Sequence, residues 1–223
     1  MMPSLPIARA LLLATFVTLT GASTNVFPAP PQNREQALAW LADPVTEKRA
    51  EAVTWIANHG TMKDAGLLQK LLRTDESGFV RDFAEQGLWL LWGRSGDAAI
   101  DRLMARGVAE IQSGNHQRAI ATFTEVIGKR PDFAEAWNKR ATVYYLAGDH
   151  AKSIADCDEV IKRNPGHFGA LAGYGQIYFA MQEYQKALEA WRRALEVNPN
   201  MLGVELNIKG VEEILKKKHG RST

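Results

Sequence analysis

The side chains that could carry metal or acid–base chemistry are scattered along this chain. Zinc sites and general acid–base catalysis need histidines and carboxylates at spacings that bring them together in the fold. Four of the five histidines fall at predicted turns or in the tail, where solvated side chains are typical. The histidines are His59, His116, His150, His167 and His219. Asp156 and Asp158 lie two residues apart on a predicted helix and point to different faces. We therefore expect no metal site and no catalytic carboxylate pair.

Motifs for nucleophilic catalysis and for phosphate binding are not found either. The run Gly93-Arg94-Ser95-Gly96 has a serine between glycines, but no predicted strand precedes it, as a nucleophile elbow requires. No glycine-rich loop followed by Lys-Ser or Lys-Thr is present to hold phosphates. We expect that the protein is not an enzyme and needs no cofactor.

Composition places the chain among soluble globular proteins. Its 223 residues are 46% hydrophobic and 23% charged, which is enough apolar material for one or two packed domains. The formal net charge of +2 gives no long-range field that would favour nucleic acid as a partner. With Cys157 as its single cysteine, the chain cannot form an internal disulfide, so packing must stabilise it. Unpaired cysteines are among the most buried residue types, and we expect Cys157 in the core.

The first 22 residues have the pattern of a secretory signal peptide. Arg9 precedes an apolar run of about ten residues, and small residues follow it, so we place the cleavage after Ala22. About 20 apolar residues are needed to cross a bilayer, so we expect no integral membrane insertion after cleavage. The protein should be exported, and periplasmic if the source is a Gram-negative bacterium. The alternative is an uncleaved N-terminal segment that holds it at the membrane. Residues 23–33 form a proline-rich spacer.

A repeat of 34 residues dominates the C-terminal half. Pro131, Pro165 and Pro199 are spaced by that period, and the other columns keep it. The small column contains Gly107, Ala141 and Gly175. The bulky column contains Phe123, Cys157 and Trp191. Each unit reads as two helices, with a small residue on one and a bulky residue on the other to fill the space between them. One hairpin cannot bury its own apolar face, so the three units must stack.

These columns resemble the tetratricopeptide repeat family over residues 100–201. The middle unit carries the residues expected by the motif at Trp137, Ala141, Tyr144, Gly148, Ser153 and Pro165. The third unit carries Leu171, Gly175, Tyr178, Ala187, Trp191 and Pro199. The resemblance implies an all-α solenoid with repeats at 100–133, 134–167 and 168–201, within a domain at 98–201. A capping helix at 202–217 and a basic tail at 218–223 would follow.

Residues 34–97 show a weaker repeat with an offset of 32. It aligns Asp43 with Asp75 and Arg49 with Arg81, and the pattern resembles a pair of HEAT repeats. In that family the turn aspartate and the second-helix arginine form a ladder between neighbours, so the resemblance implies such contacts here. Two repeats make a poor array by themselves. We expect this segment to dock on the tetratricopeptide stack.

The resemblance also implies a binding surface on the first helix of each hairpin. About 100° round the helix from the packing stripe lies a second stripe that lines the concave groove of such arrays. Its members are Met104, Val108, Ile111, Asn138, Thr142, Tyr145, Ala172, Gln176 and Phe179. Five of them are large apolar or aromatic residues, as at a partner site. The alternative is that the first three pack on the HEAT-like segment. The function implied is a non-catalytic adaptor that holds a segment of another protein.

A second interpretation is a structural component of the cell envelope that binds polysaccharide or lipid. It would use the tryptophans of the HEAT-like segment and the basic tail, which could make weak contact with an anionic surface. The tryptophans concerned are Trp40, Trp55, Trp89 and Trp92. Large aromatic residues at helical spacing are more often core residues, and cations at a helix C-terminus offset its dipole. We therefore favour the adaptor.

Export can be tested directly. Alkaline phosphatase fused after Asn33 should be active outside the cytoplasm, because the signal peptide would carry it there. N-terminal sequencing of the mature protein should begin near Ser23. Recovery of the soluble protein with Met1 intact would contradict the prediction.

Overall fold

The computed structural model describes residues 28–219, so the predicted signal peptide and the end of the tail lie outside the described residues. Within that range the chain is helical and contains no strand, which confirms the predicted all-α solenoid. The N-terminal helices are α1 (Arg34–Trp40), α2 (Thr46–His59), the short 3-10 helix η1 (Met62–Asp64), α3 (Ala65–Thr74) and α4 (Gly78–Gly93). None of the described helices has both the length and the apolar character needed to cross a membrane.

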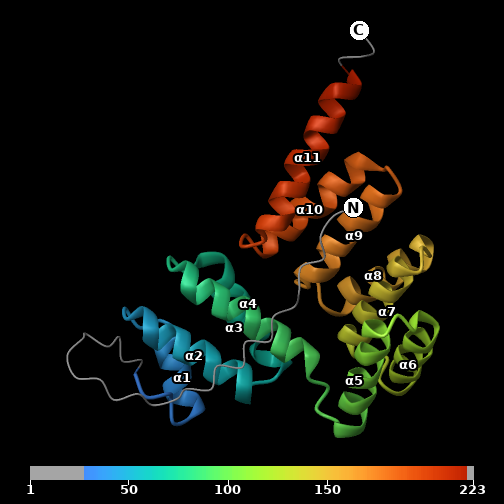
Figure 1. Cartoon of the computed structure of the whole chain (residues 1–223). Coiled ribbons are helices and arrows are strands. Elements are labelled where there is room, and N and C mark those ends of the chain that lie inside the picture. Colours follow the sequence, from blue (N-terminus) through green and yellow to red (C-terminus); the bar gives the residue numbers. More distant parts are fainter. Residues whose placement is uncertain (1–27, 220–223) are drawn as a thin grey trace, which may run out of the picture.

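Three hairpins and a long end helix follow. They are α5 (Ala98–Gln112) with α6 (His116–Lys129), α7 (Ala134–Leu146) with α8 (His150–Arg163), α9 (Phe168–Ala180) with α10 (Tyr184–Val197), and α11 (Leu202–His219). Figure 1 shows α5 to α10 stacked in chain order, with α11 continuing the array toward the C-terminus and the N-terminal helices beside it.

The turn inside each hairpin needs a left-handed residue. Gly114 and Gly148 supply it, with φ of 72° and 77°. The third hairpin has Gln182 at that position, with φ of 60°, so it accepts a conformation that costs a non-glycine residue roughly 1–2 kcal/mol. Asp149 then caps α8 by accepting a hydrogen bond from the backbone N–H of Lys152. The turn and capping residues thus determine the shape of each hairpin without any contact between hairpins.

Each hairpin closes by placing a bulky side chain on a small one. A methyl group added at Gly107 would lie 2.6 Å from the Phe123 ring, and one at Gly175 would lie 2.2 Å from Trp191. These distances are far below van der Waals contact, so only glycine permits the observed helix approach. In the middle hairpin, Ala141 and Cys157 share one apolar cluster. The small and bulky columns of the sequence therefore face each other.

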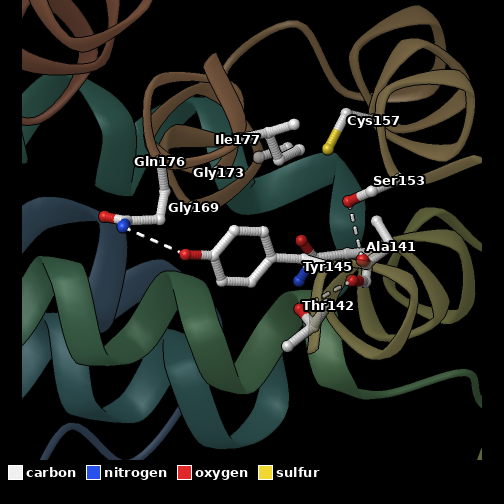
Figure 2. Close-up of a pocket in the computed structure, with 11 residues that line it drawn as sticks. Ala141, Thr142, Tyr145, Ser153, Cys157, Gly169, Gly173, Gln176 and Ile177 are labelled. Carbon is white, nitrogen blue, oxygen red and sulfur yellow. Dashed lines mark hydrogen bonds between the residues drawn. The ribbon is translucent and has the colours of Figure 1, made fainter. Parts of the chain in front are cut away.

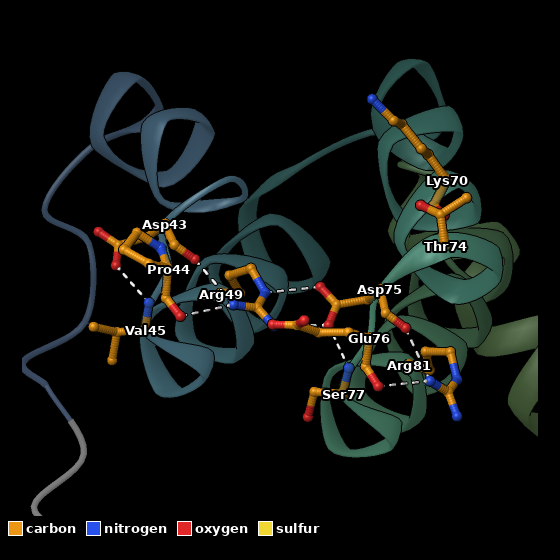
Figure 3. A network of polar contacts seen from close by, with 10 residues as sticks. All are labelled: Asp43, Pro44, Val45, Arg49, Lys70, Thr74, Asp75, Glu76, Ser77 and Arg81. Atoms are coloured by element: carbon orange, nitrogen blue, oxygen red, sulfur yellow. Dashed lines mark hydrogen bonds and ion pairs between the residues drawn. The ribbon is translucent and has the colours of Figure 1, made fainter.

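An arginine–aspartate ladder runs through the N-terminal hairpins (Figure 3) and ends on the C-terminal stack at Asn200. Arg49 donates to both carboxylate oxygens of Asp75, at 2.8 and 2.9 Å, and to the carbonyl oxygen of Asp43 at 3.0 Å. Arg81 repeats the pattern by donating to the carbonyl oxygen of Asp75 at 2.9 Å. Its Nε donates at 3.1 Å to Oδ1 of Asn200, in the turn after α10. An asparagine of the stack thus takes the place of a third aspartate.

Aromatic packing completes the docking of the N-terminal hairpins. Trp92 of α4 stacks on His167, with ring centroids 4.4 Å apart, and Trp89 meets Phe168 edge-on at 5.0 Å. Trp92 is 3% exposed, so its ring belongs to this internal contact and is not available to stack on a sugar. A methyl group at Gly169 would lie 2.4 Å from Trp89, which places α4 against the start of α9. The expected docking on the stack is therefore present.

Trp191 joins the third hairpin to the end helix. It is 2% exposed and shares a cluster with Val204 and Val211 of α11. Changing Trp191 to Ala should lower the free energy of unfolding by roughly 3–5 kcal/mol, the usual range for truncating a buried aromatic residue. Denaturant unfolding checks this value, and a loss below about 1 kcal/mol would mean that Trp191 is not a core residue.

Candidate functional site

The first three residues of the predicted groove stripe lie in a packed junction. Met104 is 7% exposed, and Val108 and Ile111 are partly buried in the same cluster. That cluster also contains Ala136 and Val143 of α7, so the second hairpin covers these side chains rather than the N-terminal helices. At this end of the stack, the stripe joins the first hairpin to the second.

The next part of the stripe opens into a hollow between α7 and α9, here called the groove pocket (Figure 2). Asn138, Thr142 and Tyr145 line it from α7, and Gln176 lines it from α9. Its volume is about 160 Å³. Four of the nine predicted residues therefore meet at one site. Ala172 and Phe179 do not line it, because they face the cluster around Trp191 and the end helix; Phe179 remains 37% exposed.

Glycines create the groove pocket, and the predicted stripe did not include them. Gly169 and Gly173 line it from α9, and a larger side chain at Gly173 would project into the space beside Cys157. For a methyl group added at Gly173, the nearest atom would be Sγ of Cys157, at 3.8 Å. Two glycines four residues apart on one helix face are visible in the sequence.

The polar groups of the groove pocket are ordered by hydrogen bonds among themselves. Gln176 Nε2 donates to the hydroxyl oxygen of Tyr145 at 3.1 Å, which links α9 to α7 across the pocket (Figure 2). Thr142 Oγ1 donates to the carbonyl oxygen of Asn138 at 3.0 Å. The Tyr145 O–H and the Gln176 carbonyl oxygen keep capacity for a ligand. No Asp, Glu, Lys, Arg or His is among the residues that line it.

Cys157 lies under the groove pocket and is not poised for nucleophilic chemistry. It is 2% exposed, and burial, with the nearby charges of Asp156 and Asp158, raises the pKa of its thiol to about 12. The thiol therefore stays protonated at neutral pH, which suits a core residue. Among the described residues, no group of His, Cys, Asp and Glu side chains has the arrangement of a metal site.

A buried polar cluster joins the starts of α7 and α9. Glu135 Oε2 lies 3.0 Å from both His167 Nε2 and Asn138 Nδ2, and Lys139 Nζ lies 2.9 Å from Oε1. His167 Nδ1 accepts from the backbone N–H of Ala170 at 3.1 Å, so its proton must sit on Nε2, facing Glu135.

The histidine of this cluster corrects one expectation from the sequence. His167 was expected to be a solvated turn residue, yet it is fully buried. It caps α9 through one ring nitrogen and binds Glu135 through the other. Burial would raise the pKa of Glu135, but hydrogen bonding to His167 and the charge of Lys139 outweigh it and lower that pKa.

Comparison with known proteins identifies the repeats. Residues 104–168 and 171–201 match the tetratricopeptide repeat family. A TPR repeat-containing protein of Rhizobium etli is 37% identical over 102 residues, which cover 46% of this chain and 50% of the relative. The matched part thus spans about half the length of that relative.

Solved structures of similar fold include two tetratricopeptide domains. The first TPR of Spaghetti (RPAP3), bound to the HSP90 peptide SRMEEVD, has a TM-score of 0.51 and 22% identity, covering 52% of this chain and 93% of that one. The Sgt2 TPR domain from Aspergillus fumigatus has a TM-score of 0.52 and 21% identity, covering 55% and 83%. At these identities the likeness concerns the fold.

Proposed function

We propose that this chain, whose C-terminal half carries tetratricopeptide repeats, is a non-catalytic adaptor that holds a segment of another protein in the groove pocket. The observation that carries the proposal is an uncharged hollow between α7 and α9, with an aromatic ring and hydrogen-bonding groups on its walls. Apolar recesses with a few convergent polar groups are typical of ligand sites. The similarity to a domain described as bound to a peptide supports a peptide as the occupant.

The rigid frame around the groove pocket favours binding without rearrangement. The α7 and α9 helices are joined beneath it by the Glu135–His167 contact and across it by the Tyr145–Gln176 bond. A preformed surface loses little conformational entropy on binding, so modest contacts suffice for useful affinity. The partner segment should be mainly uncharged, because the lining offers it no ionic group.

We further propose that the adaptor acts after export and that its N-terminal hairpins are HEAT-like. The pattern of residues 1–22 supports export, and the Arg49–Asp75 pair supports the HEAT-like assignment. In this arrangement the N-terminal hairpins hold α7 and α9 in place through Trp89 and Trp92, while the stack presents the binding surface.

Site-specific photo-crosslinking tests the location of the partner. A photoreactive residue at Thr142, which is exposed and lines the groove pocket, should capture a partner protein in intact cells. The matched control is the same residue at Leu146, four positions along the same helix, which is 49% exposed and does not line the pocket.

With the captured partner in hand, changing Tyr145 and Phe179 to Ala should weaken binding by about 2 kcal/mol or more, as for hot-spot aromatics. Because the Phe179 ring lies 6.0 Å from that of Trp191, the single Tyr145→Ala variant and thermal melts must accompany the double variant. Leu146→Ala should bind as wild type does. Unchanged capture by the folded double variant would show that the binding face lies elsewhere.

Acidic C-terminal peptides should not bind in the groove. Some tetratricopeptide proteins grip such peptides with Lys, Arg and Asn on the first helix of each hairpin. The matching positions here are Met104, Val108, Asn138, Gly169 and Gly173. No cation is among them, so a peptide carboxylate would lose water without gaining a charged partner. Isothermal titration with an acidic C-terminal heptapeptide should show no micromolar binding that depends on Tyr145 of the groove pocket. Micromolar binding by wild type that the Tyr145→Ala variant loses would contradict the prediction.

A further inference from the structure

A second hollow lies on the seam between the N-terminal hairpins and the C-terminal stack; we call it the seam pocket. It has a volume of about 130 Å³ and is lined from both sides. Trp92, Arg94 and Ser95 come from the end of α4 and the linker that follows it. Arg130 and Asn164 come from the turns after α6 and α8. It is separate from the groove pocket, because no residue lines both.

Two residues that line the seam pocket each carry a buried donor atom without a hydrogen-bond partner. The donors are Nε1 of Trp92 and Nδ2 of Asn164, on side chains of residues 3% and 8% exposed. Buried N–H groups are nearly always paired, since each unpaired one costs on the order of 1–3 kcal/mol. Both groups donate and cannot accept, so the missing partner must present acceptor atoms.

The surroundings of the seam pocket favour a negative charge. Its lining holds three arginines against two carboxylates, those of Asp132 and Glu135, a balance of 3 − 2 = +1. Asp132 already pairs with Arg130, Glu135 with Lys139, and Arg163 with Glu159, so Arg94 carries the remaining charge. Arg94 donates only to the carbonyl oxygens of Ala57 and Gly60, and no described carboxylate pairs with it.

The start of α7 adds to this positive potential. Residues 132–135 line the seam pocket. Phe133 is the N-cap residue of α7, and its apolar side chain cannot accept a hydrogen bond from the first backbone N–H groups of the helix. The first backbone N–H groups of a helix and its dipole attract an anion.

We propose that the seam pocket binds the carboxylate of a small ligand. One negative charge matches the +1 balance of the lining, and two carboxylate oxygens match the two unpaired donors. A volume of 130 Å³ fits an organic acid of a few carbon atoms. The carboxylate comes either from a free small acid or from the end of a peptide chain. Because the ligand touches both halves of the molecule, its binding stabilises their contact.

The indole of Trp92 provides the readout. In ¹⁵N-labelled protein, sodium acetate should shift the Trp92 indole N–H resonance saturably, and Trp92→Phe identifies that signal by its loss. Sodium chloride at equal ionic strength should not shift it. Acetate should also raise the melting temperature of wild type but not of Trp92→Phe, which keeps an aromatic ring and removes the donor.

Asn164 has a matched control in the same chain. Asn198 lies 34 residues later, in the equivalent turn, and is also buried, but its side chain faces Glu85 and does not line the seam pocket. Asn164→Ala should weaken acetate binding at least tenfold, and Asn198→Ala should leave it unchanged. The proposal fails if acetate gives no saturable shift, if chloride acts equally, or if both asparagine variants lose binding alike.

A further comparison separates the two sources of the carboxylate. Trialanine with a free C-terminus and its amidated form are titrated under the same conditions. Tighter binding of the free form than of acetate, with none by the amide, assigns the pocket to a chain end. Binding of acetate but not of trialanine assigns it to a small acid.

Discussion

The arrangement of both halves depends on the buried contact between Trp92, His167 and Glu135. The imidazole has one ring nitrogen committed to the start of α9 and the other to a carboxylate on α7, while Trp92 of α4 covers its face. Three helices from different parts of the chain are thus fixed by one side chain. A buried carboxylate without partners would be strongly destabilising, and His167, Asn138 and Lys139 satisfy this one.

Protonation of Glu135 would weaken this cluster, because His167, Asn138 and Lys139 all contact its carboxylate oxygens. The lowered pKa of Glu135 means that its contribution to stability is present above its ordinary pKa of 4.5 and is lost as pH falls through the folded-state value. The ionised Glu135 that joins the starts of α7 and α9 therefore persists to pH values below 4.5.

The fold followed from the sequence because its determinants are local and repeat every 34 residues. Gly107 and Phe123, or Gly175 and Trp191, occupy matching columns, and each pair fixes one hairpin without reference to the rest. Only part of the candidate site could be predicted from the sequence, because the site depends on contacts between hairpins. Met104 became buried through what α7 places opposite it, and the groove pocket opened where α9 has glycines instead. Periodicity shows which face a residue occupies but not how closely the next helix approaches that face.

The contacts that join the N-terminal hairpins to the C-terminal stack were the hardest to predict from the sequence. Asn200 completes the ladder begun by Arg49, although 119 residues separate it from Arg81 and its type differs from the aspartates before it. His167 sits in a turn, where exposure is the usual outcome, and becomes buried only because α4 covers that turn. Long-range contacts made by single polar residues produce no repeating pattern in the sequence. The two arginines and two aspartates of the ladder could be predicted because that part of the sequence repeats.

The two pockets are linked through one side chain. Glu135 lines the seam pocket, and it accepts a hydrogen bond at 3.0 Å from Asn138, which lines the groove pocket. Spatial continuity of this kind does not itself transmit a signal, because coupling requires an element with two arrangements that both ligands bias. All the hydrogen-bonding partners of Glu135 are already in place in this arrangement. A ligand in one pocket would therefore affect binding in the other mainly by making the helices between them more rigid. An occupant of the seam pocket would hold α4 against the starts of α7 and α9, and so would preserve the helix spacing that keeps the groove pocket open.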